Sequence, residues 1–233
     1  AASDRGLAIG TCYQAAVAHD QKIFSNRQDL YLGCKYSTET ILDSIRKSGL
    51  NYVRRDNIVE VAAELLSNGE IVGWFQDRSE NGPRSLGNRS ILASPHIEGI
   101  KDKLNSQIKF REKFRPFAPV TIDSFVPCES HHQVDLSSMS IAVEIPEKLK
   151  DLYGDSVHAD GTARLQVVTK KINNLFYSLL EKVAENTGSP ILINTSFNIS
   201  GEPIVETPCD ALRTFVSCGI RKLVIGSYLV SKE

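Results

Sequence analysis

The sequence predicts an α/β protein built around a mixed β-sheet. Short β-branched runs, such as IVGWFQ over 71–76 and PILINTS over 190–196, alternate with longer amphipathic stretches such as 173–187. This alternation is typical of a sheet covered by helices, and its irregularity favours a mixed sheet over a wholly parallel one. The 233 residues, 41 % of them hydrophobic, suffice for one large domain or for one domain with an appendage.

The first half of the chain is expected to hold four helices, over 3–20, 38–47, 57–68 and 97–108. Ser37 is expected to cap the second helix, with Gly49 just past its end, and Asp56 to cap the third, which Gly69 ends. Strands are expected at 71–76 and 90–94, separated by a long polar loop. Residues 21–36 show no clear period and are interpreted as a connector.

The second half of the chain repeats the alternation. Strands are expected at 139–145, 163–169, 190–196 and 222–230, and a helix over 173–187 that ends at Gly188. Thr207, with Pro208 and Asp210 one and three residues later, predicts the start of a helix that Gly219 closes.

The bulk composition limits the function classes. The formal net charge of −1 gives no general attraction to nucleic acid or membranes. The chain has no run near the roughly 18 apolar residues that a membrane span needs, and its start lacks the pattern of a secretory signal. Five scattered cysteines without CxxC spacing indicate free thiols, so we expect a cytoplasmic protein and no zinc site.

Positive charge is nevertheless concentrated between Arg84 and Arg115, where eight basic residues stand against three acidic ones. In KFREKFRPFAP, cations recur at every second residue from Lys109 to Arg115. If this segment is extended, the cations form a basic strip and Phe110 and Phe114 anchor the opposite face. A solvated basic surface is the plainer alternative.

Three polar loops accompany this charge: NGPRSLGNRS over 81–90, HADGTARLQ over 158–166 and NTSFNISGEP over 194–203. Two of them follow predicted strands, and ligand sites in α/β proteins gather at strand ends. Arginine suits bidentate recognition of phosphate. The loops therefore predict a site for a phosphorylated compound, although GxxxxGK[ST] and GxGxxG motifs are absent.

These loops, in this order, resemble the C-terminal half of the NodU/CmcH carbamoyltransferase family. The matching text is GWFQDRSENGPRSLGNRSILASP, DKLNSQIKFREKFRPFAPV, HADGTARLQVV and SPILINTSFNISGEPIVETPCDAL. The resemblance implies a YrdC-like α/β domain over 37–233, with a basic concave pocket in a twisted mixed sheet. Residues 1–36 are similar to the end of the family's N-terminal, actin-like domain, and form a remnant or connector.

The resemblance also implies an enzyme. ATP and carbamoyl phosphate would give carbamoyl-adenylate, whose carbamoyl group passes to the hydroxyl of a small-molecule acceptor in the N-terminal domain. Magnesium would arrive with the nucleotide, and no protein metal site is implied. The alternative is a YrdC-like module that binds double-stranded RNA or a nucleotide without catalysis; we rank nucleic acid below carbamoyl phosphate as a ligand and expect no membrane partner.

Carried over residue by residue, the resemblance assigns two sets of side chains. The catalytic set is Arg84, Lys113 and Arg115. The set that binds substrate or nucleotide is Asn88, Arg89, Arg111, Arg164, Thr195, Ser196, Asn198 and Ser200. The family usually has Phe and Ala where this chain has Asn81 and Ser85, so we expect altered packing there.

Overall fold

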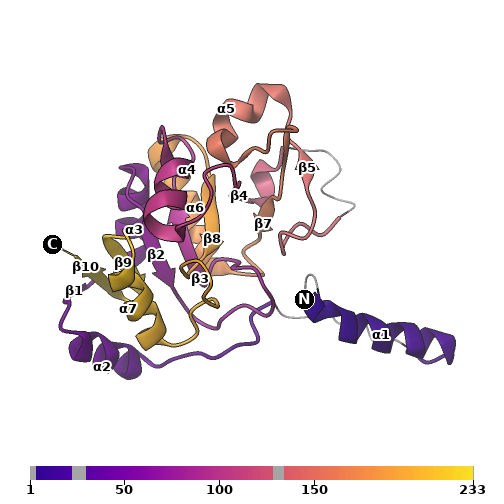
Figure 1. Ribbon diagram of the computed structural model, residues 1–233, viewed down its shortest axis with the longest axis horizontal. Helices are drawn as coiled ribbons and strands as arrows, with labels where there is room; N and C mark the ends of the chain where they lie inside the picture. The colour runs from indigo at the N-terminus through magenta and orange to yellow at the C-terminus, as the bar shows by residue number, and fades with distance from the viewer. Residues whose placement is uncertain (1–3, 23–29, 128–133, 233) are drawn as a thin grey trace.

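The computed structural model describes residues 4–22, 30–127 and 134–232. It is a mixed α/β structure in which helices cover both faces of an eight-stranded sheet (Figure 1). The sheet has the order β1-β10-β9-β2-β3-β8-β4-β7, and a second sheet pairs β5 with β6. The pairs β2–β9 and β4–β7 are parallel and the other pairs of the large sheet are antiparallel, which confirms the expected mixed sheet.

The strands are β1 (Asn51–Arg54), β2 (Val72–Phe75), β3 (Arg89–Ala93), β4 (Ala118–Ile122), β5 (Val143–Glu144), β6 (Thr162–Ala163), β7 (Gln166–Val168), β8 (Leu192–Ser196), β9 (Lys222–Ile225) and β10 (Tyr228–Ser231). The α-helices are α1 (Asp4–Ala18), α2 (Thr38–Ser48), α3 (Ile58–Ser67), α4 (Ile100–Lys103), α5 (Lys150–Tyr153), α6 (Asn174–Thr187) and α7 (Pro208–Ser217). A π-helix, η1 (Leu104–Lys109), extends α4, and short 3-10 turns lie at η2 (Asp123–Phe125), η4 (Glu147–Leu149) and η5 (Gly154–Ser156).

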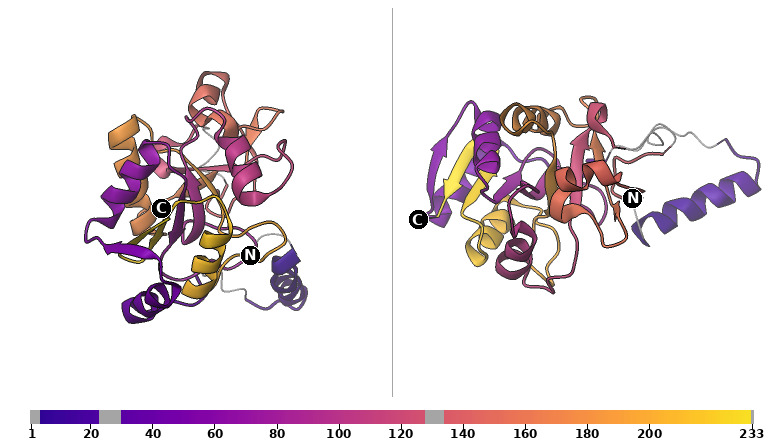
Figure 2. Two further views of the ribbon diagram at one scale, coloured as in Figure 1. Left: turned by 60° about the vertical axis from the view of Figure 1, so that its left-hand side comes forward. Right: turned by 90° about the horizontal axis from the view of Figure 1, so that it is seen from above.

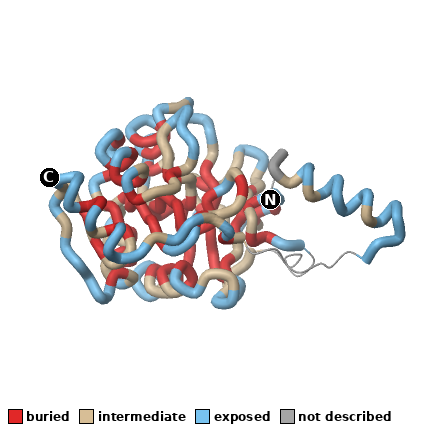
Figure 3. The backbone as a smooth tube through the Cα atoms, turned by 90° about the horizontal axis from the view of Figure 1, so that it is seen from below, coloured by how far each residue is buried: buried red, intermediate tan, exposed pale blue. Residues whose placement is uncertain are grey.

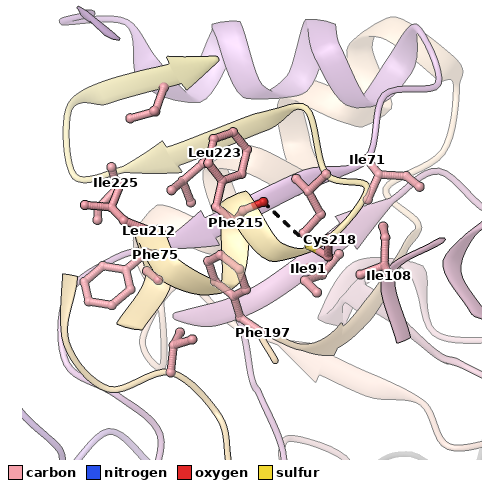
Figure 4. Packing of buried hydrophobic residues seen from close by; sticks show 14 of the residues in the cluster. Ile71, Phe75, Ile91, Ile108, Phe197, Leu212, Phe215, Cys218, Leu223 and Ile225 are labelled. Carbon is pink, nitrogen blue, oxygen red and sulfur yellow. Dashed lines mark hydrogen bonds between the residues drawn. The ribbon is translucent and has the colours of Figure 1, made fainter. Parts of the chain in front are cut away.

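Successive side chains of the central strands point to opposite faces of the sheet, so two hydrophobic layers form. Ile91 and Ala93 of β3 face α2, α7 and the α4–η1 segment, whereas Leu92 faces α3 and α6. Figure 4 shows the first layer, where Phe75, Phe197 and Phe215 meet aliphatic side chains of the strands. Views from two further sides show helices on either side of the sheet (Figure 2). The central strands are therefore buried on both faces.

Local helix signals were read correctly at α2 and α7. The Ser37 side chain accepts from Thr40 N, and Gly49 ends the helix in the left-handed conformation. Thr207 and Asp210 form the complete capping box. At α3 the prediction was wrong by one residue: Asn57, not Asp56, holds the N-cap position.

Several strands differ from expectation. Residues 222–230 form two strands, β9 and β10, because the chain turns at Gly226, whose φ is +56°. The predicted strand 163–169 is divided between β6 and β7, which belong to different sheets. The short strands β1 and β4 were not predicted.

Helix α1 confirms the helix expected over 3–20 and lies apart from the sheet and its covering helices (Figure 1). Most of its length is exposed (Figure 3). Residues 30–36, in contrast, are bound to the body of the molecule: Gly33 N donates to Ser79 O at 3.0 Å and Asn81 N donates to Leu30 O at 2.7 Å. Residues 30–36 of the predicted connector therefore pack beside the 81–90 loop.

Among the described cysteines, Cys12, Cys34, Cys209 and Cys218 are free thiols, and Cys128 lies outside the described residues. Within the described ranges no helix is both long and apolar enough to cross a membrane.

Candidate functional site

The register of the large sheet brings the polar loops together at one end of its strands. Phe75, at the end of β2, pairs with Arg89, and Ser196, at the end of β8, pairs with Ser90. The loops 76–88 and 197–206 therefore leave the sheet at the same side. The starts of β4 and β7 reach this side too, because both strands run opposite to β8. Arg164, just before β7, is thus brought to the two loops.

Glu80 fixes the shape of the 81–90 loop. Its Oε1 accepts from the backbone N–H groups of Leu86 at 2.7 Å, Asn88 at 2.7 Å and Arg89 at 3.1 Å. Gly87 has a φ of +108°, and a Cβ there would lie 2.1 Å from Phe176 Cδ1, so only glycine fits. The loop is therefore held by its own carboxylate and by close packing.

A cavity of about 90 Å³ opens between this loop and the end of β8. We call it the arginine cavity. Its lining includes Arg84, Arg111, Arg164, Ser85, Phe117, Asn194, Thr195 and Ser196. Since a cavity needs roughly 10–15 Å³ to hold a single water, this one has room for several water-sized groups. It is thus far smaller than a nucleotide and fits a small anion.

The cavity has an excess of positive charge. Burial lowers the pKa of Arg164, and the nearby Arg84 and Arg115 lower it further. The pKa of Arg111 is lowered by burial and then by Arg115 and Arg164. Among the described residues no carboxylate forms an ion pair with Arg84, Arg111 or Arg164. These guanidinium groups therefore repel one another, and a bound anion would relieve the repulsion.

Arg111 is held in place by neutral groups. Its Nε donates to Asn105 Oδ1 at 2.7 Å, and its guanidinium carbon lies 4.6 Å from the centre of the Phe117 ring. Since these partners carry no charge, they fix the side chain without neutralising it. Arg111 is thus oriented in advance for an anion.

The buried Lys109 holds the loop that follows β8. Its Nζ donates to the backbone oxygens of Ser196 and Asn198 and, at 3.2 and 2.8 Å, to Ser196 Oγ and Asn198 Oδ1. Burial, with help from Arg111, lowers the pKa of Lys109 from 10.5 to about 7. Lys109 therefore ties two predicted ligand residues, Ser196 and Asn198, to the end of η1.

A second hollow, of about 320 Å³, adjoins the arginine cavity, and the two share Pro83 and Ser196. We call it the acidic hollow because Glu80, Glu202 and Glu206 line it, together with Asn198. Carboxylates accept hydrogen bonds from hydroxyl and amino groups and repel phosphates. The acidic hollow therefore suits a polar donor group, whereas the arginine cavity suits an anion.

The structure brings only some of the predicted site residues together. Arg84, Arg111, Arg164, Thr195 and Ser196 line the arginine cavity, and Asn198 lines the acidic hollow. Arg115, exposed and 3.8 Å from Glu112, lies near the cavity without lining it. Lys113 points to Asp102 at 3.5 Å, and Ser200 is exposed and lines neither space.

Asn88 and Arg89 are buried in the fold. The guanidinium of Arg89 stacks 3.7 Å from the Phe75 ring centre and donates to four backbone carbonyls, those of Cys34, Gln76, Asp77 and Asn88. The Asn88 amide donates to Arg78 O and accepts from Asn173 Nδ2. Neither side chain lines the arginine cavity.

The predicted basic strip over 109–115 is wrong. The helix continues through Lys109, and Phe110 has a φ of +48°, so the side chains do not alternate as in a strand. Lys109 is buried, whereas Phe110 and Phe114 are 55 % and 78 % exposed and anchor nothing. The cations of this segment thus point to different places.

Sequence reasoning missed the neutral wall of the arginine cavity. Asn194 is 1 % exposed and Ser85 is 2 % exposed, and Gln166, 1 % exposed, lies behind Asn194. Buried amides on strands are unusual, because each must find hydrogen-bond partners. An Asn and a Gln inside predicted strands were therefore the signal in the sequence that could have revealed this wall.

No group of three or more His, Cys, Asp or Glu side chains suited to a metal occurs in the described ranges.

Comparison with known proteins identifies the family. The profile described as carbamoyltransferase C-terminus matches residues 63–232. The chain belongs to this family. The matched range contains all the residues that line the arginine cavity.

Curated relatives agree with this membership of the carbamoyltransferase C-terminus family. The chain is 38 % identical to nodulation protein NolNO of Sinorhizobium fredii, over 100 % of the chain and 35 % of that protein. It is 39 % identical to nodulation protein NolO of Bradyrhizobium diazoefficiens, over 100 % of the chain and 44 % of that protein. It is 32 % identical to 3'-hydroxymethylcephem-O-carbamoyltransferase of Streptomyces clavuligerus, over 96 % of the chain and 41 % of that protein.

The chain therefore spans less than half the length of these relatives. Among solved structures, HypF of T. kodakarensis overlaps with a TM-score of 0.48 at 19 % identity, over 74 % of the chain and 20 % of HypF. At this level the overlap says nothing about function, and the family assignment comes from the sequence matches.

Proposed function

We propose that this chain is a YrdC-like domain that binds carbamoyl phosphate and ATP and forms carbamoyl-adenylate for O-carbamoyl transfer. The observation that carries the proposal is the group of three arginines, Arg84, Arg111 and Arg164, that line one small cavity without a carboxylate partner among the described residues. Family membership and the named O-carbamoyltransferase relative support the same reaction class.

In this proposal the two spaces divide the substrates. The phosphate of carbamoyl phosphate lies in the arginine cavity, where the guanidinium groups donate to its oxygens. The nucleoside end of ATP lies toward the acidic hollow, whose glutamates accept from hydroxyl and amino groups. The triphosphate lies at their border, beside Ser196 and the Lys109-bound loop.

Carbamoyl-adenylate forms in two steps. Water releases phosphate from carbamoyl phosphate and leaves carbamate; a carbamate oxygen then attacks the α-phosphorus of ATP, and pyrophosphate leaves. Both steps bring anions together, so the unpaired arginines lower the repulsion and stabilise the charge of the transition state. Magnesium carried with the nucleotide would neutralise part of the phosphate charge.

The hydroxyl acceptor and its site lie outside this chain in the proposal. The curated relatives are more than twice as long as the part that the chain matches. We propose that a preceding actin-like domain holds the acceptor and that residues 1–36 lead from it.

The test is pyrophosphate release from ATP that depends on carbamoyl phosphate. We expect Arg164→Ala to lower this rate by about 10²-fold, as for the loss of one preorganised donor. Arg54→Ala is the matched control, because Arg54 is exposed on the edge strand β1 and pairs with Asp56. A rate that Arg84→Ala, Arg111→Ala and Arg164→Ala all leave unchanged would refute the assignment.

A further inference from the structure

One wall of the arginine cavity is neutral: Ser85 and Asn194 line it, and the buried Gln166 behind Asn194 extends their hydrogen bonds into the fold. Gln166 Nε2 donates to Leu86 O at 2.8 Å, and Gln166 Oε1 accepts from Asn194 Nδ2 at 2.7 Å. Asn194 Nδ2 also donates to Ser85 O at 3.3 Å, while Asn194 Oδ1 accepts from Ser85 Oγ at 3.2 Å. All three polar side chains are at least nine-tenths buried, since none is more than 2 % exposed.

The backbone fixes the direction of every hydrogen bond in this wall. A carbonyl only accepts, so Leu86 O requires the NH₂ group of Gln166 on its side. The oxygen of Gln166 then faces Asn194, which must present its own NH₂ group. Asn194 Oδ1 is thereby turned to Ser85, whose hydroxyl donates. An inverted Asn194 would place oxygen against oxygen at Gln166 and NH₂ against the Ser85 hydroxyl.

This arrangement makes the wall an acceptor. Both N–H bonds of Asn194 are used, by Gln166 Oε1 and Ser85 O. Asn194 Oδ1 receives one bond, from Ser85, and an amide oxygen has two lone pairs. Asn194 and Ser85 both line the arginine cavity. The free capacity of the wall is therefore that of hydrogen-bond acceptors, whereas the guanidinium groups of the same cavity only donate.

A ligand that satisfies both walls needs an anionic end for the arginines and an N–H or O–H donor within the same small volume. Carbamoyl phosphate has this composition, because its NH₂ group lies a few bonds from its phosphate. Acetyl phosphate has nearly the same shape but presents a methyl group in place of the NH₂ group. In a cavity this size, a methyl group against Asn194 would leave Oδ1 with the Ser85 bond alone and its second lone pair unused.

We propose that Asn194 reads the NH₂ group of the carbamoyl moiety through Oδ1, and that Gln166 is the positioning residue that fixes the direction of the Asn194 amide. The proposal rests on the function proposed above and deepens it: the arginines hold the phosphate, and the neutral wall selects the carbamoyl group over an acyl group.

The experiment is a calorimetric titration of the purified chain with carbamoyl phosphate, acetyl phosphate and inorganic phosphate. We expect carbamoyl phosphate to bind at least about 10-fold more tightly than acetyl phosphate, because sites built to bond a substrate N–H reject analogues that lack it. Asn194→Ala should weaken carbamoyl phosphate binding about 10-fold or more and change acetyl phosphate and inorganic phosphate binding by less than about 3-fold.

Gln166→Met tests the positioning role, because it removes the acceptor that orients Asn194 without touching the cavity wall. We expect the preference for carbamoyl over acetyl phosphate to fall while inorganic phosphate still binds. Wild-type selectivity needs no variant, so the proposal can be tested even if Asn194→Ala does not fold.

The outcomes separate the two proposals. Equal binding of carbamoyl and acetyl phosphate to the wild-type chain would overturn the role of Asn194 and leave the phosphate-binding function standing. The same holds if Asn194→Ala weakens all three ligands alike. If the wild-type chain binds none of the three, the proposed function itself fails and this inference fails with it.

Discussion

Replacing Arg89 with leucine separates a structural arginine from a ligand-binding one. The family resemblance places Arg89 at the phosphates, whereas its guanidinium is buried among four backbone carbonyls and stacked on Phe75. Burial also lowers the pKa of Arg89. We expect Arg89→Leu to destabilise the fold rather than to remove a ligand contact alone.

The size of the effect follows from the carbonyls that lose their donor. Asn88 O and Cys34 O keep a second donor, Gln76 N at 2.9 Å and Ser79 N at 3.3 Å. Gln76 O and Asp77 O have only Arg89 among the hydrogen bonds of the described ranges. Each of these two carbonyls, left without a hydrogen-bond donor, costs about 1–3 kcal/mol, and the loss of the stacking contact costs about 1–2 kcal/mol more. Relief of the buried charge offsets part of this, so the net loss is about 3–5 kcal/mol.

Urea unfolding at neutral pH measures this loss, with Arg54→Leu as the control for an exposed arginine. A loss of 3–5 kcal/mol is a large part of the about 5–15 kcal/mol typical of a domain. If Arg89→Leu lowers the free energy of unfolding by less than about 1 kcal/mol yet abolishes carbamoyl phosphate binding, the guanidinium serves the ligand and our interpretation is wrong.

Three further predictions concern the framework of the site. Gly87→Ala should cost at least about 2 kcal/mol in thermal unfolding, because its Cβ would collide with Phe176 at a φ of +108°; a wild-type melting temperature would contradict this. Thr207→Ala should cost about 1 kcal/mol through loss of its capping box with Asp210 and leave ligand affinity unchanged. Because burial lowers the Lys109 pKa from 10.5 to about 7, the charged form is penalised in the fold. The free energy of unfolding, measured against Lys109→Met, should therefore rise from pH 7 to pH 10.5 and not fall.

The elements that follow from local chemistry were predictable from the sequence. Ser37 and Thr207 cap helices through bonds to N–H groups three residues away, so nearby residues suffice. Strand β4 was missed because APVTI is short, carries a proline and follows another one at Pro116. What makes it a strand is its pairing with β7 and β8, which no local pattern contains.

The sequence predicted part of the set of residues that line the arginine cavity, but not all of it. Composition and the family resemblance pointed to Arg84, Arg111 and Arg164, which the fold does gather. They could not show that Arg89 turns into the fold, because a buried and an exposed arginine look alike in a sequence. Asn194 was missed because its place in the cavity wall depends on the fold, which brings it beside the distant Ser85.

We propose that Arg84, Arg111 and Arg164 together bind the phosphate of carbamoyl phosphate. Calorimetric titration of carbamoyl phosphate into the wild-type chain and Arg164→Ala, at one fixed salt concentration, tests it most directly. We expect saturable binding to the wild-type chain, at least about 10-fold weaker binding to Arg164→Ala, and unchanged binding to Arg54→Ala. Equal affinity for wild type and Arg164→Ala would contradict it.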